Sequence, residues 1–354
     1  MLPRENRPPL RPLPKRANLR NLPDCAEQEV QSGPAPTGAL AGGPCPACSS
    51  PDLRVLFDAH DRLHRTTTDR YRIVECAQCR LIRLDPSPKT PPILDHPSRW
   101  PTGDSAADRF ERAYRRFLFT DHTGFILRAL DAAGEGGPVL DLSPEGGLLR
   151  ATLVKHGLPV IGLDHSEEAV AANRKAHGST TSLRADLLAA PLAPASCRAI
   201  TMLQVLEHLD SPVAWIEAAH ALLRPEGRLI LQAPNAACWE FLLLGENWSG
   251  LDVPRHRIDF RASDLESLLE AAGFEVLRRK HFSLRDNPAS LAMSLAPWLA
   301  PAVRRARGTL EGPAVKLAKH LLWCGLMMAA LPFTVLEAAC RAGSTVMIEA
   351  RKKP

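Results

Sequence analysis

Residues 138–150, PVLDLSPEGGLLR, constrain the fold of this 354-residue chain more than any other stretch. Their apolar first half carries one acid, Asp141, and breaks into a turn of proline and glycine before a helical pattern begins at Leu148. A buried strand that leads through a tight turn into a helix is where α/β proteins hold nucleotide-like ligands. Glycines at such a turn let backbone N–H groups approach the ligand. Ser143 and Glu145 stand where glycine is expected, so the sequence predicts a recognisable but altered site.

The segments that follow alternate between strand-like apolar runs and helical patterns. A second strand, residues 158–164, ends in Asp164, and a third ends near Asp186. In nucleotide-binding folds, an acid at the end of the second strand accepts hydrogen bonds from ribose hydroxyls. The alternation predicts an α/β fold with a doubly wound parallel sheet. Further strands are expected at residues 199–203, 228–233, 274–282 and 344–350, the last two antiparallel.

Two C-x-x-C pairs, separated by 27 residues, precede this domain. Two thiolates on each turn can grip one metal, and two such turns complete a tetrahedral site suited to Zn²⁺. Strand-like stretches at 53–57 and 70–74 predict a hairpin between the pairs, hence a zinc ribbon over residues 41–90. Unpaired cysteines or a redox dithiol would not explain two matched pairs. Four thiolates leave no open position, so the zinc is expected to be structural, with the ligands Cys45, Cys48, Cys76 and Cys79.

Five stretches, in their order and spacing, resemble class I S-adenosylmethionine-dependent methyltransferases: VLDLSPEGG, VIGLDHS, RADL, ITMLQVLEHLDSP and LLRPEGRLILQAPN. The later stretch NWSGLDVPRHRIDFRASDLESLLEAAGFEVL is similar to the branch associated with ubiquinone-type and sugar or lipid methylation. Several members of that branch also begin with a four-cysteine ribbon. The resemblance covers about residues 44–283 and the final strand. It implies a seven-stranded Rossmann-like sheet and S-adenosylmethionine as the cofactor.

The resemblance also implies roles for seven residues. The turn after the first strand would hold the methionine part of the cofactor, and the acid after the second strand its ribose. The acid after the third strand, with the leucine that follows it, would contact the adenine, and a glutamine would line the floor beside the sulfonium. The positions are Asp141, Ser143, Gly147, Asp164, Asp186, Leu187 and Gln204. Only the last glycine of the family's G-C-G-x-G turn is kept, and the Glu145 carboxylate could repel that of the cofactor.

Few residues are candidates for the chemistry itself. Methyl transfer needs an aligned nucleophile, and it needs a base only if the acceptor must lose a proton. His256 could take that proton and Arg255 could hold an anionic substrate group, whereas a packing role is the alternative for His256. Ubiquinone-type relatives place a divalent metal on an E-x-x-E-H pattern that here reads Gln204 to His208. A neutral amide in place of the first acid weakens such a site, and Glu207 and His208 could instead cap the next helix.

The composition places the chain among soluble globular proteins. Hydrophobic residues make up 45% and charged residues 23%, with a formal net charge of +5. Residues 1–40 are rich in proline and arginine, lack the apolar core of a secretory signal, and are expected to be a disordered tail. Paired cysteines suggest metal binding in a reducing compartment, so we expect a cytoplasmic protein. The ribbon lacks the interleaved basic and aromatic surface that RNA binding requires, which argues against nucleic acid as the partner.

Residues 284–342 form an unusually apolar insertion between the last two strands, before a final strand and basic tail at 343–354. The stretch 321–336 contains no charge, but 16 residues interrupted by Pro332 are short for a transmembrane helix. Basic residues just before this stretch would suit a helix pair that lies on the inner face of a membrane. A buried cap over the site and a dimer contact are the alternatives.

Together these features predict a methyltransferase domain at residues 105–283 that modifies a small or lipid-linked acceptor, of saccharide or quinone-like chemistry. A rival hypothesis is a catalytically silent protein that binds nucleic acid or another partner through its ribbon and basic tails. An RNA methyltransferase is the second alternative.

Overall fold

The computed structural model describes residues 43–88, 105–143, 146–164, 166–167, 170–171 and 181–353. The expected N-terminal tail and Glu145 lie outside these residues. The larger sheet consists of β4 (Val139–Asp141), β5 (Val160–Asp164), β6 (Thr181–Arg184), β7 (Cys197–Leu203), β8 (Leu223–Pro234), β10 (Phe274–Lys280) and β11 (Thr345–Lys352). The smaller sheet consists of β1 (Leu53–His60), β2 (Arg70–Cys76), β3 (Ile82–Asp85) and β9 (Ile258–Asp259). The α-helices are α1 (Ala106–Ala132), α2 (Gly146–Lys155), α4 (Pro212–Leu222), α5 (Trp239–Leu244), α6 (Ala262–Ala271), α7 (Asn287–Leu295), α8 (Pro301–Ala306) and α9 (Pro313–Ala339).

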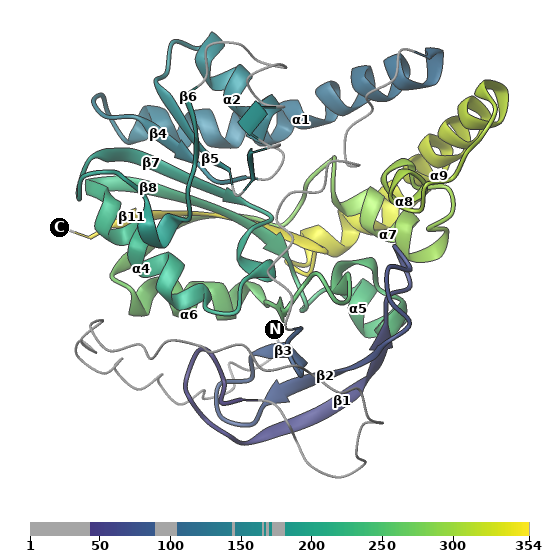
Figure 1. Ribbon diagram of the computed structural model, residues 1–354, viewed down its shortest axis with the longest axis horizontal. Helices are drawn as coiled ribbons and strands as arrows, with labels where there is room; N and C mark the ends of the chain where they lie inside the picture. The colour runs from purple at the N-terminus through teal and green to yellow at the C-terminus, as the bar shows by residue number, and fades with distance from the viewer. Residues whose placement is uncertain are drawn as a thin grey trace.

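The larger sheet confirms the predicted α/β fold class. Its seven strands lie in the order β10-β11-β8-β7-β4-β5-β6 (Figure 1). β4, β5, β6, β7 and β8 pair in parallel, and only β11 runs antiparallel to its neighbours β8 and β10. The carboxyl ends of the parallel strands therefore share one edge, where α/β folds bind ligands.

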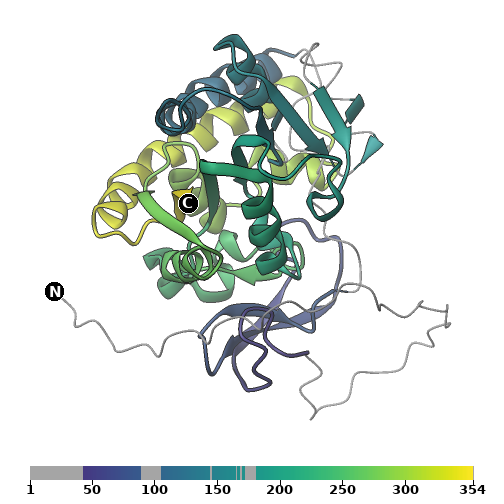
Figure 2. The same cartoon turned by 90° about the vertical axis from the view of Figure 1, so that its left-hand side faces the viewer.

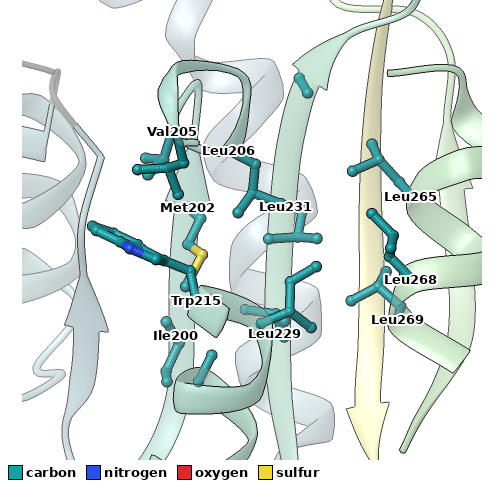
Figure 3. Close-up of a cluster of buried hydrophobic side chains, with 14 of the residues drawn as sticks. Ile200, Met202, Val205, Leu206, Trp215, Leu229, Leu231, Leu265, Leu268 and Leu269 are labelled. Atoms are coloured by element: carbon teal, nitrogen blue, oxygen red, sulfur yellow. The ribbon is translucent and has the colours of Figure 1, made fainter. Parts of the chain in front are cut away.

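Both faces of this sheet are covered, because alternate residues of each strand point to opposite sides. On one face Ile200, Leu229 and Leu231 pack against α4 and α6, as Figure 3 shows with Trp215 and Leu265. On the other face the neighbouring strand residues, such as Ala199 and Ile230, pack against α1 and α2. These two layers form the hydrophobic core and hold the strand ends in place.

The cysteine-bearing segment folds into the predicted hairpin, in which β1 and β2 pair antiparallel. β3 and β9 extend this hairpin into a four-stranded sheet that lies beside the larger one (Figures 1 and 2). The pairing of β9 with β3 was not predicted, because two residues are too few to show a strand periodicity. Helix α6 begins at Ala262, and Asp264 Oδ2 accepts from the Arg261 N–H at 3.0 Å.

A buried ion pair ties the hairpin of the smaller sheet to the loop after α5. Arg255, three residues before β9 in this loop, reaches Asp61 just after β1, with 3.0 Å between Nη2 and Oδ1. The backbone carbonyl of Arg255 lies 3.0 Å from Nδ1 of His208, which follows β7 of the larger sheet. Both side chains are buried. Burial alone would raise the pKa of Asp61, but hydrogen bonds from Arg255 and Thr66 lower it to about 2. The pair therefore stabilises the contact between ribbon and core at neutral pH.

Replacing Asp61 tests this connection. Asp61→Asn should lower the free energy of unfolding by about 2 kcal/mol at neutral pH, since a carboxyl whose pKa falls from 3.8 to about 2 on folding stabilises the folded state above both values. The difference from the wild type should shrink as the pH falls from 3.8 towards 2, where the carboxylate is protonated. Urea unfolding across this pH range measures it, with the exposed Asp58→Asn as the control. An equal loss in both variants would contradict the account.

Candidate functional site

The turn after β4 is organised by Asp141, which is fully buried. Its Oδ1 accepts hydrogen bonds from Thr201 Oγ1 at 2.6 Å, from Ser143 Oγ at 2.7 Å and from Ser143 N at 3.2 Å. Ser143 Oγ accepts in turn from the Leu203 N–H at 3.2 Å. The serine in the glycine position therefore ties the turn to β7, which a glycine could not do.

Arg150 in α2 connects the first two acids of the site. Its fully buried guanidinium donates from Nε to Asp141 Oδ2 at 2.9 Å and from Nη1 to Asp164 Oδ2 at 2.8 Å. Gly162 on β5 makes room for it, because a Cβ there would lie 2.3 Å from the guanidinium carbon. Burial acts to lower the pKa of Arg150, but the two carboxylates outweigh it and raise the pKa. The cation thus holds both acids in fixed positions behind the strand ends.

The remaining cofactor positions lie along the same edge. Asp164 ends β5 and is buried, and Gly147 lies buried in the first turn of α2. Asp186 is exposed, and its Oδ1 accepts from the Leu188 N–H at 2.8 Å, which caps the short 3₁₀ turn that begins at the buried Leu187. These residues therefore lie together at the carboxyl edge of the parallel strands. Their contacts with a cofactor stay predictions.

A cavity of about 210 Å³ lies at this edge, beside Gln204 at the end of β7. Gln204 has a left-handed backbone (φ 57°), and its N–H donates to Gln232 O at 2.8 Å. Three parts of the chain enclose the cavity: the larger sheet, the ribbon through Leu63 and His64, and the insertion through residues such as Met293. The cavity therefore exists only because ribbon and insertion close over the sheet.

His256, in the loop after α5, lines this cavity. Its Nδ1 lies 2.7 Å from Gly250 O, and since a carbonyl only accepts, Nδ1 carries a proton in this contact. Asp252 Oδ2 lies 4.0 Å from Nε2. Burial would raise the pKa of Asp252, but Arg255, His64 and His256 lower it well below the ordinary value. A carboxylate therefore stands beside the imidazole.

Arg255 does not support the anion-binding role expected for it. It is absent from the cavity wall, and its guanidinium binds Asp61 and Asp252, with a further contact to Val253 O at 3.3 Å. A residue whose donors are committed to internal acids is positioned for structure. Contrary to the expectation, Arg255 anchors the ribbon and orients the carboxylate of Asp252.

His256 also belongs to a cluster of three buried groups, whose other two members, Glu207 and His208, are not part of the cavity wall. Glu207, His208 and His256 each place one ligand atom within 4.8 Å of the others. His208 Nδ1 lies 3.0 Å from Arg255 O, so it donates there, and its ring packs edge-on against that of His256. Nearby, burial and the charge of Glu207 raise the pKa of Asp259. This set could hold a divalent cation, and Gln204 is not part of it.

The four cysteines form a second cluster, in the ribbon. Their sulfur atoms lie within 4.8 Å of one another, with 3.5 Å between Cys45 and Cys79 and 3.6 Å between Cys48 and Cys76. The edge of a tetrahedron with Zn–S bonds of about 2.3 Å is about 3.8 Å, so the sulfurs fit a zinc ion. The residue after each pair, Ser49 and Arg80, has a left-handed backbone, so the two turns have matching geometry.

Two groups at the site were missed from the sequence. The sequence could have indicated Arg150 as a buried residue, since it is the one charged residue within the apolar run 147–154. Asp286 also lines the cavity, bound by Gln232 Nε2 at 2.6 Å and by His122 Nε2 at 3.0 Å. No sequence pattern could have indicated Asp286, because its partners lie on α1 and β8, far away in the sequence.

Comparisons with known proteins agree with this arrangement. Residues 114–279 match the family model described as a methyltransferase domain. The chain is 30% identical over 173 residues to the ubiquinone biosynthesis O-methyltransferase of Pseudomonas aeruginosa, covering 46% of this chain and 73% of that protein. Its counterpart from Xanthomonas oryzae pv. oryzae is 31% identical over 165 residues, which cover 43% of this chain and 67% of that protein.

Among solved structures, a SAM-dependent methyltransferase from Archaeoglobus fulgidus is similar over 68% of this chain and 99% of its own, at 14% identity and a TM-score of 0.43. The family is shown by the sequence relatives, of which the chain covers 73% and 67% at 30% and 31% identity. The chain belongs to the class I S-adenosylmethionine-dependent methyltransferases.

Proposed function

We propose that this methyltransferase modifies a hydroxyl group on a quinone-like or saccharide acceptor, small or lipid-linked, that binds in the cavity beside Gln204. The observation that carries the proposal is the mixed wall of that cavity. Ala289, Met293 and Val303 supply an apolar side, whereas His256 and Asp286 supply polar groups. A volume of about 210 Å³ is below the roughly 300–1,000 Å³ of most ligand pockets, so it suits one ring-sized group.

The relatives support the quinone-like member of this pair. Two ubiquinone biosynthesis O-methyltransferases are 30% and 31% identical to the chain, and the apolar wall suits an aromatic ring better than a sugar. The insertion that supplies this wall fits a lipid-linked acceptor equally well, since a tail could leave the cavity along apolar helices.

The residues at the carboxyl edge of the larger sheet would have separate roles in the reaction. When bound, S-adenosylmethionine supplies an electrophilic methyl group on its sulfonium. Asp164, fixed by Arg150, would hold the ribose, and Gln204, which lines the cavity, would lie beside the sulfonium. His256 Nε2 would take the proton of the acceptor hydroxyl, and Asp252 would stabilise the resulting imidazolium. The ribbon and insertion exclude water from this step.

The four cysteines would hold a structural zinc ion. The ion would fix the two turns of the ribbon, which in turn places Asp61, Leu63 and His64 against the larger sheet. Without a cation, the hydrogen bond from Cys79 lowers the pKa of Cys45 to about 5, whereas burial raises the pKa of Cys48 to about 11. Zinc is the cation that would let all four thiolates form.

Cofactor binding should depend on Arg150. Arg150→Lys keeps the charge but cannot bridge two acids with a planar fork, so we expect S-adenosylmethionine to bind about tenfold more weakly. Isothermal titration measures the affinity, and the control is Arg184→Lys on the neighbouring strand, whose guanidinium is largely exposed. Circular dichroism checks that both variants fold. Unchanged affinity in Arg150→Lys would refute the positioning role, and no binding by the wild type would refute the cofactor assignment.

Methyl transfer should depend on His256. With a tritium-labelled methyl group on S-adenosylmethionine, we expect transfer to a dihydroxybenzoate or a short-chain quinol, and a drop in kcat of about 100-fold in His256→Gln, with unchanged cofactor affinity. His60→Gln, an exposed histidine of β1, is the matched control. Transfer to a phenyl glycoside alone would favour the saccharide acceptor. Transfer to RNA alone, or cofactor-free RNA binding that weakens with salt, would favour the rival hypotheses.

The purified protein should contain one zinc ion per chain by elemental analysis. Cys76→Ser should lose the metal, because three thiolates and a hydroxyl hold zinc more weakly, whereas Cys340→Ser, an exposed cysteine outside the cluster, should keep it. Removing the metal with a chelator should lower the thermal stability of the wild type. A full complement of zinc in Cys76→Ser would contradict the assignment of the four ligands.

A further inference from the structure

Helix α9 is inverted relative to an ordinary surface helix: its apolar side faces outward. Leu322 is 61% exposed and Met328 68% exposed, although both are large apolar side chains. The exposed residues recur every three or four positions along all 27 residues of the helix. We call them the apolar stripe: Pro313, Ala314, Val315, Ala318, Leu321, Leu322, Gly325, Met328, Ala329, Pro332, Val335, Leu336 and Ala339. At 1.5 Å per residue the stripe is about 40 Å long and carries no charge.

The polar residues of α9 face the protein instead. Lys316 Nζ lies 2.7 Å from Asp108 Oδ1, and His320 Nε2 lies 3.1 Å from Glu111 Oε2, both on α1. Further along, Glu337 Oε1 accepts from the Glu240 N–H at 3.0 Å. These contacts fix which side of the helix faces outward, so the stripe is not an accident of a loosely packed helix.

Neighbouring elements extend the apolar surface. In α5, which packs on α9 through Trp239 and Phe333, Leu242 is 75% and Leu243 72% exposed. α7 also packs against α9, and Trp298, just after it, is largely exposed. Apolar patches of this extent on a soluble protein mark a surface that something apolar covers.

The amino-terminal half of α1 adds basic and aromatic groups beside the stripe. Phe110 and Phe117 are exposed there. Arg109 and Arg116 are exposed too, whereas the acids Asp108 and Glu111 are buried against α8 and α9. In Figure 1 this half of α1 projects in the same direction as the start of α9. Exposed apolar, aromatic and basic side chains without an exposed acid among residues 105–120 complement an anionic lipid surface.

We propose that the apolar stripe is a docking surface for the face of an anionic phospholipid bilayer. Of the described residues, α9 is the one helix long and apolar enough to cross a membrane, but only 22% of its most apolar window is buried. Its inward side is ion-paired along α1, and β11 begins in the central sheet six residues after its last residue. The helix therefore lies along the bilayer surface. This inference stands whatever acceptor the enzyme modifies.

A second copy of the chain fits the stripe less well. Two helices that pair in water need Leu, Ile or Val at the central positions and charged residues along the flanks. The stripe offers Gly325, Pro332 and several alanines instead, and charged residues such as Lys316 are turned towards α1. A bilayer accepts an apolar surface of any shape, so it suits a stripe that continues onto other helices.

The basic residues before the apolar stretch 321–336, which were expected to face the membrane, form ion pairs within the protein instead. Arg304 and Lys319 pair with Glu311, and Arg305 pairs with Glu111 at 2.7 Å. They hold α8 and α9 in place. Attraction to anionic lipid therefore depends on the exposed basic residues of α1.

Flotation of the full-length protein tests the proposal. With vesicles of phosphatidylcholine and phosphatidylglycerol, the wild type should float, and Leu322→Glu/Met328→Glu should bind at least about tenfold more weakly because two apolar contacts are replaced by charges. Val55→Glu, another exposed apolar position on β1, is the matched control and should float like the wild type. Both stripe positions are exposed, so circular dichroism should show a normal fold.

Three outcomes would overturn the proposal. The wild type could stay at the bottom of the gradient, or the two variants could float equally well. Sedimentation could also show a dimer that Leu322→Glu/Met328→Glu dissociates while neither protein binds vesicles, in which case the stripe is a contact between copies of the chain. Weaker flotation with phosphatidylcholine alone would support the role of α1.

Discussion

The buried guanidinium of Arg150 is the interaction on which the site depends. It compensates the carboxylates of Asp141 and Asp164, at 2.9 and 2.8 Å, where two buried negative charges would otherwise repel each other. Asp141 in turn holds Ser143, whose hydroxyl is tied to β7. At the start of the altered turn, the side-chain contacts of Ser143 thus take the place of the family's glycine, and Asp164 lies where the fold binds ribose.

A second buried arginine makes the rest of the site possible. Its side chain holds Asp61 of the ribbon and Asp252 of the cavity loop, and its carbonyl contacts His208 after β7, so Arg255 links the small sheet, the loop and the larger sheet. The cavity is closed by parts of the chain that meet only in the folded protein. Zinc binding by the cysteines and bilayer docking by α9 would both act on this enclosure from outside, the first through Leu63 and His64 and the second through α7 and α8.

The sequence predicted what local periodicity encodes. The strands that end at Asp141 and Asp164 were found because buried parallel strands are continuous apolar runs, and the two C-x-x-C pairs are close in space as their spacing predicted. The partners of charged residues could not be predicted, because Arg255 and Asp61 are 194 positions apart. The orientation of α9 was also hidden, since an apolar run looks the same whether its apolar side faces the core or the solvent.

The central claim is that the carboxyl ends of β4 and β5 form an S-adenosylmethionine site despite the altered turn. A crystal structure with S-adenosylhomocysteine, the demethylated product, tests it most directly. The account predicts the ribose hydroxyls within hydrogen-bonding distance of Asp164, Arg150 still bridging both acids, and the sulfur facing the cavity beside Gln204. A product bound elsewhere, or a ribose that displaces Arg150 from Asp164, would contradict it.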